Sequence, residues 1–436
     1  MNKFHESLLE YGKILKGWML KGGLSILDQS ISSGASFLLS VLLGRWFGVH
    51  EYGIFAFAMA FLSLFYQVQN AVIMEPMSVI GPSTYPDAID PYLSQQRKIH
   101  FWIFIPLGLI IAIGAVIYGA LGGESDLRNI LILLGVLAAL IQLPWMIRRS
   151  FYVVHQPGRA AFYSLIYTVI LLGSLFWFHI QGWLSTTISL VLMSGAGLLA
   201  VLVILNQIRR RGSSNHPPQL RQIWRQNWGY GKWMLLVGAM FALAVQVPIY
   251  LSGLLINTDA SGVIKAMQNF MQPMAISIAA ITALIIPMLS KDFGKGEFSN
   301  IRRKQKAMTL ILVVLAVAYE LLLVIFAVPL ELFLYNGKYA EYVQLIPLWG
   351  LIPIFTAVQA GSSAMIRAFQ KPRRILFVAI SWCLVSLFSG FFLIREWGVM
   401  GATISAVIGY AIASAAYIII ASRLDPVSKK YVEEES

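Results

Sequence analysis

Long runs of apolar residues, separated by short polar connections, dominate this chain from residue 19 to residue 421. A helix of about 20 such residues crosses the roughly 30 Å hydrocarbon core of a bilayer. The pattern therefore predicts an all-α integral membrane protein with about twelve transmembrane helices. The predicted spans are 19–43, 54–80, 101–121, 129–147, 158–178, 184–206, 233–256, 261–289, 308–329, 343–366, 374–394 and 398–421.

Lysine and arginine are distributed unevenly over the connections between these spans. With the N-terminus inside, 28 of the 33 cations fall in inner connections or at the termini, 4 fall in outer connections, and Lys265 falls within a span. Positive residues concentrate on the cytoplasmic side of membrane proteins. We therefore expect an even number of spans and both termini in the cytoplasm.

Two regions outside the spans have amphipathic patterns. Residues 1–18 are predicted to form a cytoplasmic helix on the membrane surface, with a disordered tail as the alternative. Residues 207–232 are predicted to be a basic cytoplasmic linker with a second amphipathic helix, and residues 422–436 a cytoplasmic tail. The helical spacing in the linker comes from Leu220, Ile223, Trp224 and Trp228.

Short matches relate the first half of the chain to the second. Tyr-Gly-Lys and Trp-Met-Leu occur at 11–13 and 18–20 before the first span, and again within 230–235 before the seventh. Pro-Met occurs near the ends of the second and eighth spans. We therefore predict two parallel six-helix halves, 19–206 and 233–421, around a central cavity, as in transporters with parallel repeats.

The composition agrees with this class and argues against others. Apolar residues make up 58% of the 436 residues and charged residues only 12%, against about 25% in a soluble domain. The net charge of +13 arises in the connections, so it does not indicate nucleic-acid binding. The single cysteine, Cys383, allows no internal disulfide. The sequence has no phosphate-binding Gly-x4-Gly-Lys-Ser/Thr motif and no histidine pair at metal-ligand spacing, so we expect no enzyme activity, cofactor or metal.

Polar side chains form faces on three of the predicted spans. Such groups are costly in lipid and usually face a bundle interior or a wet cavity. We interpret them as the lining of a hydrated central cavity. The candidates are Asp28 in the first span, Gln67, Asn70 and Glu75 in the second, and Lys265, Gln268, Asn269 and Gln272 in the eighth.

Structural alternatives stay open for several of these residues. The alternative for Glu75 is a position at the membrane interface. The alternative for the amides is that they only join helices. Lys265 begins its span, so snorkelling to the outer surface is its alternative. Glu320 has no polar companions at helical spacing and is either a proton site or a residue at the lipid edge.

Four stretches carry a resemblance to a known family: LGRWFGVHEYGIFA at 43–56, EPM and VIG within 75–81, GVIKAMQNF at 262–270 and MIRAFQKP at 365–372. They resemble segments of polysaccharide biosynthesis flippases, the O-antigen flippase-like branch of the multidrug/oligosaccharidyl-lipid/polysaccharide exporter superfamily. Lys265 stands where arginine is frequent in that family. Lipid II flippases, which belong to the same superfamily, usually carry two further spans that are missing here.

The resemblance implies a function in a bacterial cytoplasmic (inner) membrane. The chain would move a lipid-linked oligosaccharide, built on polyprenyl diphosphate, from the inner to the outer leaflet by alternating access. Lys265 and Arg45 are then candidate cations for the diphosphate, the amides are candidate sugar ligands, and Asp28 and Glu75 are candidate coupling carboxylates. Membrane lipids are partners, while a proton or sodium ion, a polysaccharide polymerase and glycosyltransferases are further partners left open.

Two other functions are considered beside the flippase. A proton- or sodium-coupled exporter of drugs or small cations would use Asp28 and Glu75 as substrate ligands. A membrane-embedded glycosyl transferase or ligase would need catalytic groups on a sizeable external loop. The predicted outer connections are all short, which argues against this enzyme.

Overall fold

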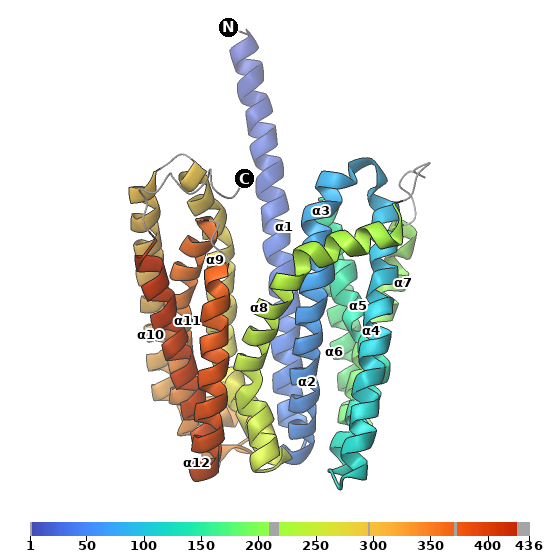
Figure 1. Ribbon diagram of the computed structural model, residues 1–436, viewed down its shortest axis with the longest axis vertical. Coiled ribbons are helices and arrows are strands. Elements are labelled where there is room, and N and C mark those ends of the chain that lie inside the picture. Colours follow the sequence, from blue (N-terminus) through green and yellow to red (C-terminus); the bar gives the residue numbers. More distant parts are fainter. Residues whose placement is uncertain (1, 209–217, 295–296, 370–372, 425–436) are drawn as a thin grey trace. The chain divides into compact units, whose positions relative to one another are not determined.

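The computed structural model describes residues 2–208, 218–294, 297–369 and 373–424. Helices account for every regular element of this part of the chain (Figure 1). The α-helices are α1 (Asn2–Trp46), α2 (Val49–Gln69), α3 (Glu75–Thr84), α4 (Ile89–Ala120), α5 (Ser125–Val153), α6 (Pro157–Ile180), α7 (Thr186–Ile208), α8 (Leu220–Leu255), α9 (Thr258–Gly294), α10 (Phe298–Tyr335), α11 (Leu345–Ala368) and α12 (Arg373–Ser422). Shorter elements are the π-helix η1 (Asn70–Met74) and the 3-10 helices η2 (Pro86–Ala88) and η3 (Ala340–Tyr342).

Every predicted span coincides with a helix. Ten helices in the described part of the chain are long and apolar enough to cross a bilayer. One of them, α12, contains the last two predicted spans, which are separated at Gly398, where a φ of 55° interrupts the helix. The helix α9, 37 residues long, covers the predicted eighth span. The predicted all-α membrane fold with about twelve spans is confirmed.

The first helix differs from the prediction. α1 continues unbroken from Asn2 to Trp46, so no boundary separates the predicted surface helix 1–18 from the first span. The segment contains no proline, and its glycines, including the pair Gly22 and Gly23, lower the helix propensity without ending the helix. Most of the predicted tail 422–436, and residues 209–217 of the predicted linker, lie outside the described residues.

The chain forms two compact units. The first comprises residues 1–39 and 61–235, and the second comprises residues 40–60 and 236–436. The segment 40–60, which covers the end of α1 and the first half of α2, therefore belongs to the second unit although it precedes most of the first in sequence. The predicted six-helix halves 19–206 and 233–421 stay a prediction, and each unit is described by itself below.

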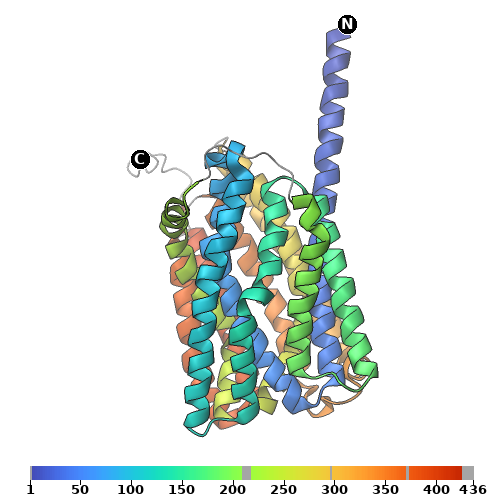
Figure 2. The same cartoon turned by 90° about the vertical axis from the view of Figure 1, so that its right-hand side faces the viewer.

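In the first unit, α4 and α5 lie side by side along their length (Figure 2). Their backbones touch at a pair of glycines. A Cβ atom on Gly108 would lie 2.0 Å from the carbonyl oxygen of Gly135, and a Cβ on Gly135 would lie 2.4 Å from the carbonyl oxygen of Gly108. Small residues allow such close approach between helices in a membrane, where packing replaces the hydrophobic effect as the main attraction.

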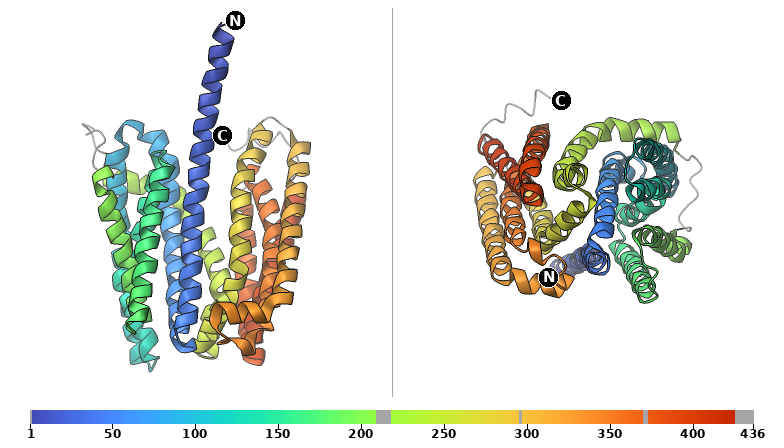
Figure 3. Two further views of the ribbon diagram at one scale, coloured as in Figure 1. Left: turned by 180° about the vertical axis from the view of Figure 1, so that it is seen from behind. Right: turned by 90° about the horizontal axis from the view of Figure 1, so that it is seen from below.

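In the second unit, α11 packs against α9, α10 and α12 (Figure 3). An apolar core joins α9, α10 and α11. The residues of this core are Met274, Ile278, Met308, Leu312, Ala316, Ala357 and Ala360. The polar stripe formed by Lys265, Gln268, Asn269 and Gln272 lies nearer the N-terminal end of α9 than the residues of this core.

Replacing Gly108 by leucine is expected to destabilise the first unit, because the new side chain meets backbone atoms that cannot rotate away. Overpacking of this kind costs about 1–3 kcal/mol. Thermal unfolding in detergent micelles should show a lower midpoint for Gly108→Leu. Gly114→Leu, on the same helix, is the matched control, because a Cβ there meets nothing within 4 Å. Equal midpoints for the two variants would contradict the close contact.

Candidate functional site

A polar face on α9 is the first part of the candidate site. Lys265, Gln268 and Gln272 are spaced by three and four residues, which places them on one side of the helix. Lys265 and Gln272 are half-buried, whereas Gln268 is buried and its amide nitrogen has no acceptor. Across the residues that the structure describes, Lys265 has no hydrogen-bond or ion-pair partner. An ammonium group in a spanning helix without a protein partner requires water or an anionic ligand.

Asn269, the fourth residue of the predicted stripe, is directed into the second unit. Its Oδ1 accepts a hydrogen bond from Ser40 at 2.9 Å, and its Nδ2 donates to the hydroxyl oxygens of Tyr52 and Tyr335, both at 2.9 Å. Only 1% of its surface is exposed, and both of its amide hydrogens are in use. Asn269 therefore has no free donor for a sugar, and its contacts are those of a structural residue.

Arg45, the second predicted head-group cation, caps a helix in the second unit. Its guanidinium donates to the carbonyl oxygen of Phe333 at 3.0 Å and to the side chain of Asn336 at 2.7 Å, at the end of α10. In return, Lys338 donates to carbonyl oxygens at the end of α1. Helix C-termini carry partial negative charge, so these cations stabilise both ends.

The environment of Lys338 agrees with this capping role. The residue lies in the connection between α10 and α11, outside the spans. Burial lowers the pKa of its ammonium group. The three carbonyl oxygens that accept its hydrogen bonds favour the charged form and offset part of that cost.

Asp28, a predicted coupling carboxylate, is the centre of a buried ion pair in the first unit. The Nε atom of Arg148 lies 3.0 and 2.9 Å from its two carboxylate oxygens. The hydroxyl groups of Tyr152 and Ser164 donate to the same carboxylate. Asp28 is fully buried, and the side chain of Arg148 is 14% exposed. The carboxylate is therefore neutralised by α5 and hydrogen-bonded by α6, which joins both helices to α1.

The remaining predicted residues lie where α2 changes to the π-helix η1. Pro76 follows η1 closely, has no N–H and crowds the carbonyl four residues earlier, so a widened turn at this position is physically reasonable. Asn70 donates to Glu75 over a long 3.4 Å, and Gln67 is half-buried. Arg149 donates to the hydroxyl oxygen of Ser78 at 3.0 Å, within one turn of Glu75 on α3.

A buried amide and histidine network supports η1 from inside the first unit. Gln69 donates to the carbonyl oxygen of Gln142 at 2.8 Å and lies 3.1 Å from Nδ1 of His100. Gln142 in turn donates to the carbonyl oxygen of Leu62 at 2.9 Å. The side chains of Gln69 and His100 have no exposed surface. These residues hold α2, α4 and α5 together and are not available to a ligand.

Glu320 on α10 is a buried carboxylate within the second unit. It is 8% exposed, and its Oε2 atom has no hydrogen-bond partner in the described part of the chain. It lies against Gly350 of α11, where a Cβ would meet this oxygen at 1.7 Å. Burial argues against the alternative of a residue at the lipid edge. The other alternative, a proton site, stays a prediction.

Sequence reasoning missed the residues that neutralise Asp28. Arg148 was counted only as an inner cation, because the predicted span ended at 147. The helix α5 continues to Val153 and carries Arg148 and Tyr152 to the carboxylate on α1. One signal in the sequence points to such a partner. Asp28 is a carboxylate within a predicted span, and no cation lies close to it in the sequence, so its counter-charge must come from another helix.

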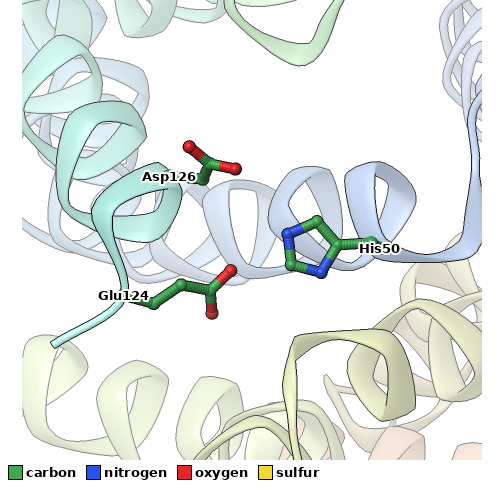
Figure 4. A group of neighbouring side chains, drawn as sticks. All are labelled: His50, Glu124 and Asp126. Atoms are coloured by element: carbon green, nitrogen blue, oxygen red, sulfur yellow. The ribbon is translucent and has the colours of Figure 1, made fainter.

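Figure 4 shows His50, Glu124 and Asp126, which belong to different units. Glu124 and Asp126 lie at the start of α5 in the first unit. His50 lies in the second unit, where its Nδ1 is 2.8 Å from a carboxylate oxygen of Asp259. His50 is thus engaged within its own unit, and we assign no metal site to these residues.

Comparisons with known proteins bear on the fold. No family model matches the chain, and no curated protein matches its sequence. An inward-facing multidrug resistance MATE family transporter of the MOP superfamily superposes with a TM-score of 0.68 at 13% identity, covering 92% of this chain and 94% of that one. The chain has a MATE-like transporter fold.

Two further structures agree with this fold. The inward closed lipid II flippase MurJ gives a TM-score of 0.69 at 11% identity, with 93% of this chain and 87% of that chain covered. The eukaryotic MATE transporter AtDTX14 gives 0.65 at 15% identity, with 93% and 97% covered. These proteins are transporters and a flippase rather than enzymes. Such low identities show the MATE-like fold alone, so the O-antigen flippase branch stays a prediction.

Removing the carboxylate of Asp28 is expected to destabilise the first unit strongly. Asp28→Ala leaves Arg148 buried without a counter-charge, which costs about 3–5 kcal/mol. Replacing both residues, as Asp28→Ala with Arg148→Met, should recover much of the loss, because no unpaired charge remains. The measurement is the free energy of unfolding in mixed micelles.

Asp87→Ala is the control for this experiment, since Asp87 is exposed in η2 of the same unit. It should leave stability unchanged. If the effects of Asp28→Ala and Arg148→Met simply added in the double variant, the ion pair would not be the coupling that the geometry indicates.

Proposed function

We propose that this MATE-like chain translocates a lipid-linked oligosaccharide, a polyprenyl diphosphate carrying sugars, from the inner to the outer leaflet. The proposed setting is a bacterial cytoplasmic membrane with both chain termini inside. Alternating access of the two predicted halves is the proposed route. The partners that this function requires are the glycosyltransferases that make the substrate and a polymerase that uses the product.

The observation that carries the proposal is the unpartnered ammonium group of Lys265. Among the described residues no carboxylate pairs with it. A diphosphate would supply the missing negative charge, and a charge-assisted hydrogen bond between the two is about twice as strong as a neutral one. Lysine binds phosphate as a point charge with three donors, which suits a head group that must also be released.

The amides beside Lys265 supply what the sugars need. Gln268 has a buried amide nitrogen without an acceptor, and Gln272 lies one turn further along the same face. A buried donor without a partner costs about 1–3 kcal/mol, which a sugar hydroxyl or water can offset. The α9 polar face thus combines one cation for the diphosphate with amide groups for hydroxyls. Gln67, on α2 in the first unit, stays a separate candidate sugar ligand.

Charge argues against the alternative, a proton- or sodium-coupled exporter of drugs or cations. Such an exporter would use Asp28 and Glu75 as its cation ligands. Asp28 is already bound by Arg148 and by two hydroxyl groups. Glu75 accepts a hydrogen bond from Asn70, and Arg149 binds Ser78 one turn further along α3. The fold is compatible both with a lipid-linked oligosaccharide and with a drug or cation as substrate. These contacts favour the lipid-linked oligosaccharide.

Transport by the proposed route is coupled to an ion. Asp28 is neutralised by an arginine, which makes it a weaker coupling candidate than the sequence suggested. Glu75 stays a candidate, and Glu320 joins it as a buried carboxylate with one oxygen unpartnered in the described residues. A proton is the ion that we propose, because a buried carboxylate without a cation nearby is stable only in its neutral form.

Lys265→Ala is expected to reduce surface polysaccharide roughly tenfold or more, since the lost charge-assisted bond is worth about 1.5–3 kcal/mol. Membrane abundance of the variant should match the unaltered protein, because Lys265 has no partner to lose among the residues that the structure describes. Lys265→Arg, which keeps the charge, should retain most of the export. The measurement is surface polysaccharide per cell, normalised to transporter in the membrane fraction.

Lys306→Ala is the matched control, an exposed lysine in the predicted inner connection between the eighth and ninth spans. It should leave export unchanged. Normal export in Lys265→Ala would remove the site assignment. Resistance to cationic dyes on overexpression, without any effect on surface polysaccharide, would favour the exporter instead.

A further inference from the structure

The first part of α8 forms an amphipathic surface helix in the first unit. We call residues 220–233 the α8 surface segment. Figures 1 and 2 show it running across the neighbouring helices of the first unit rather than along them. α8 then continues without interruption to Leu255. The segment therefore leads directly into the predicted seventh span, which begins at residue 233.

The inner side of this segment is firmly attached to the first unit. Asn227 is fully buried and exchanges two hydrogen bonds with Gln96 of α4, at 3.2 and 2.9 Å. Gln226 accepts a hydrogen bond from the Tyr85 hydroxyl at 2.9 Å. A Cβ atom on Gly231 would lie 2.4 Å from the carbonyl oxygen of Ala71. These contacts fix the rotation of the segment about its own axis.

The fixed rotation leaves an aromatic and cationic side uncovered. Trp224 is 38% exposed and Trp228 is 45% exposed, and their rings stack at 5.7 Å with an interplanar angle of 26°. Arg221, Arg225 and Lys232 are exposed on the same side, at spacings of three, four and seven residues from these tryptophans or from each other. We call these five residues the outer face of the α8 surface segment.

The charged residues of the α8 surface segment are all positive. From Pro218 to Asn257 the sequence contains no aspartate or glutamate. Salt bridges within the segment therefore cannot neutralise its cations. Stacked indole rings have a large apolar surface and a single N–H donor each, which suits the boundary between head groups and acyl chains better than bulk water.

The position of the segment favours lipid over a protein as the binding partner of its outer face. A helix rises 1.5 Å per residue, so Trp228 and Lys232 lie within about 8 Å of the start of the span at residue 233. At that distance Trp228 and Lys232 lie at the level of the lipid head groups. Trp233, 59% exposed and directly under the ammonium group of Lys232 at 5.9 Å, continues the aromatic surface into the span.

We propose that the outer face of the α8 surface segment is a binding site for anionic phospholipid, in which Trp224 and Trp228 insert at the head-group boundary while Arg221, Arg225 and Lys232 bind lipid phosphates. Each basic residue near an anionic leaflet adds to such attraction, and the effect is screened by salt. This site is separate from the α9 polar face and does not depend on the proposed transport function. Its ligand is a membrane lipid in the inner leaflet rather than a transported substrate.

The test uses the full chain in nanodiscs of phosphatidylcholine and phosphatidylglycerol at a molar ratio of about 7 to 3, a range in which anionic lipid governs surface potential. Bromine on the acyl chains of one lipid at a time quenches nearby tryptophan fluorescence. The signal of Trp224 and Trp228 is the difference between the unaltered protein and the variant Trp224→Phe with Trp228→Phe. Per bromolipid, phosphatidylglycerol should quench this difference signal about twofold more than phosphatidylcholine, and high salt should reduce the ratio towards one.

Charge removal provides the second arm. The variant Arg221→Gln with Arg225→Gln and Lys232→Gln should lose the preference for phosphatidylglycerol while retaining quenching by phosphatidylcholine. Arg302→Gln with Arg303→Gln, which removes exposed cations of the second unit, is the matched control and should keep the preference. Labelling of the buried Cys383 under native conditions reports whether each variant is folded.

Two results would overturn the proposal. Equal quenching by the two lipids would show that the cations do not select anionic head groups. Quenching of the difference signal by aqueous iodide but by neither bromolipid would place the tryptophans in water or against a soluble protein partner.

Discussion

Asn269 makes the hydrogen bonds on which the geometry of the second unit depends. A primary amide buried in an apolar membrane protein must have partners for its donors and its acceptor, because no water compensates for their loss. Its partners are Ser40 near the end of α1, Tyr52 on α2 and Tyr335 at the end of α10. The network therefore connects four helices through one side chain. It also fixes the rotation of α9, which keeps Lys265 and Gln272 on the half-buried side of that helix.

The stretch 43–56 has the same structural character. Gly44 lies against the rings of Tyr335 and Tyr52, and Gly53 lies against the backbone of Thr258, where a Cβ would meet the carbonyl oxygen at 1.9 Å. Arg45 caps α10 while Lys338 caps α1. The residues that most resemble a flippase family thus hold helices together rather than contact a ligand. Their resemblance indicates a common fold more directly than a common substrate, which agrees with the structural likeness to both MATE transporters and MurJ.

Hydrophobic pattern alone predicted the fold class because the membrane imposes it: every buried backbone group must be paired, so each apolar run becomes a helix. The pattern also predicted the polar stripe of α9, because its residues are only three or four positions apart in the sequence. It could not find that Arg148 binds Asp28, because 120 residues separate them and only tertiary packing brings α5 to α1. It could not show that Asn269 turns inward while Lys265 does not, because the two lie on adjacent parts of the same helical face. The pattern also could not show the continuity of α1, because a change from an amphipathic to an apolar pattern does not by itself end a helix.

The proposed function requires an anionic substrate whose charge is neutralised by the ammonium group of Lys265. The most direct measurement reconstitutes the purified protein in liposomes with a polyprenyl diphosphate oligosaccharide and follows the arrival of its sugars on the opposite leaflet with an impermeant lectin. A cationic dye serves as the parallel substrate in the same vesicles. The account predicts that the protein accelerates appearance of the sugar and leaves the dye where it started. Movement of the dye, with the sugar no faster than in protein-free vesicles, would contradict it.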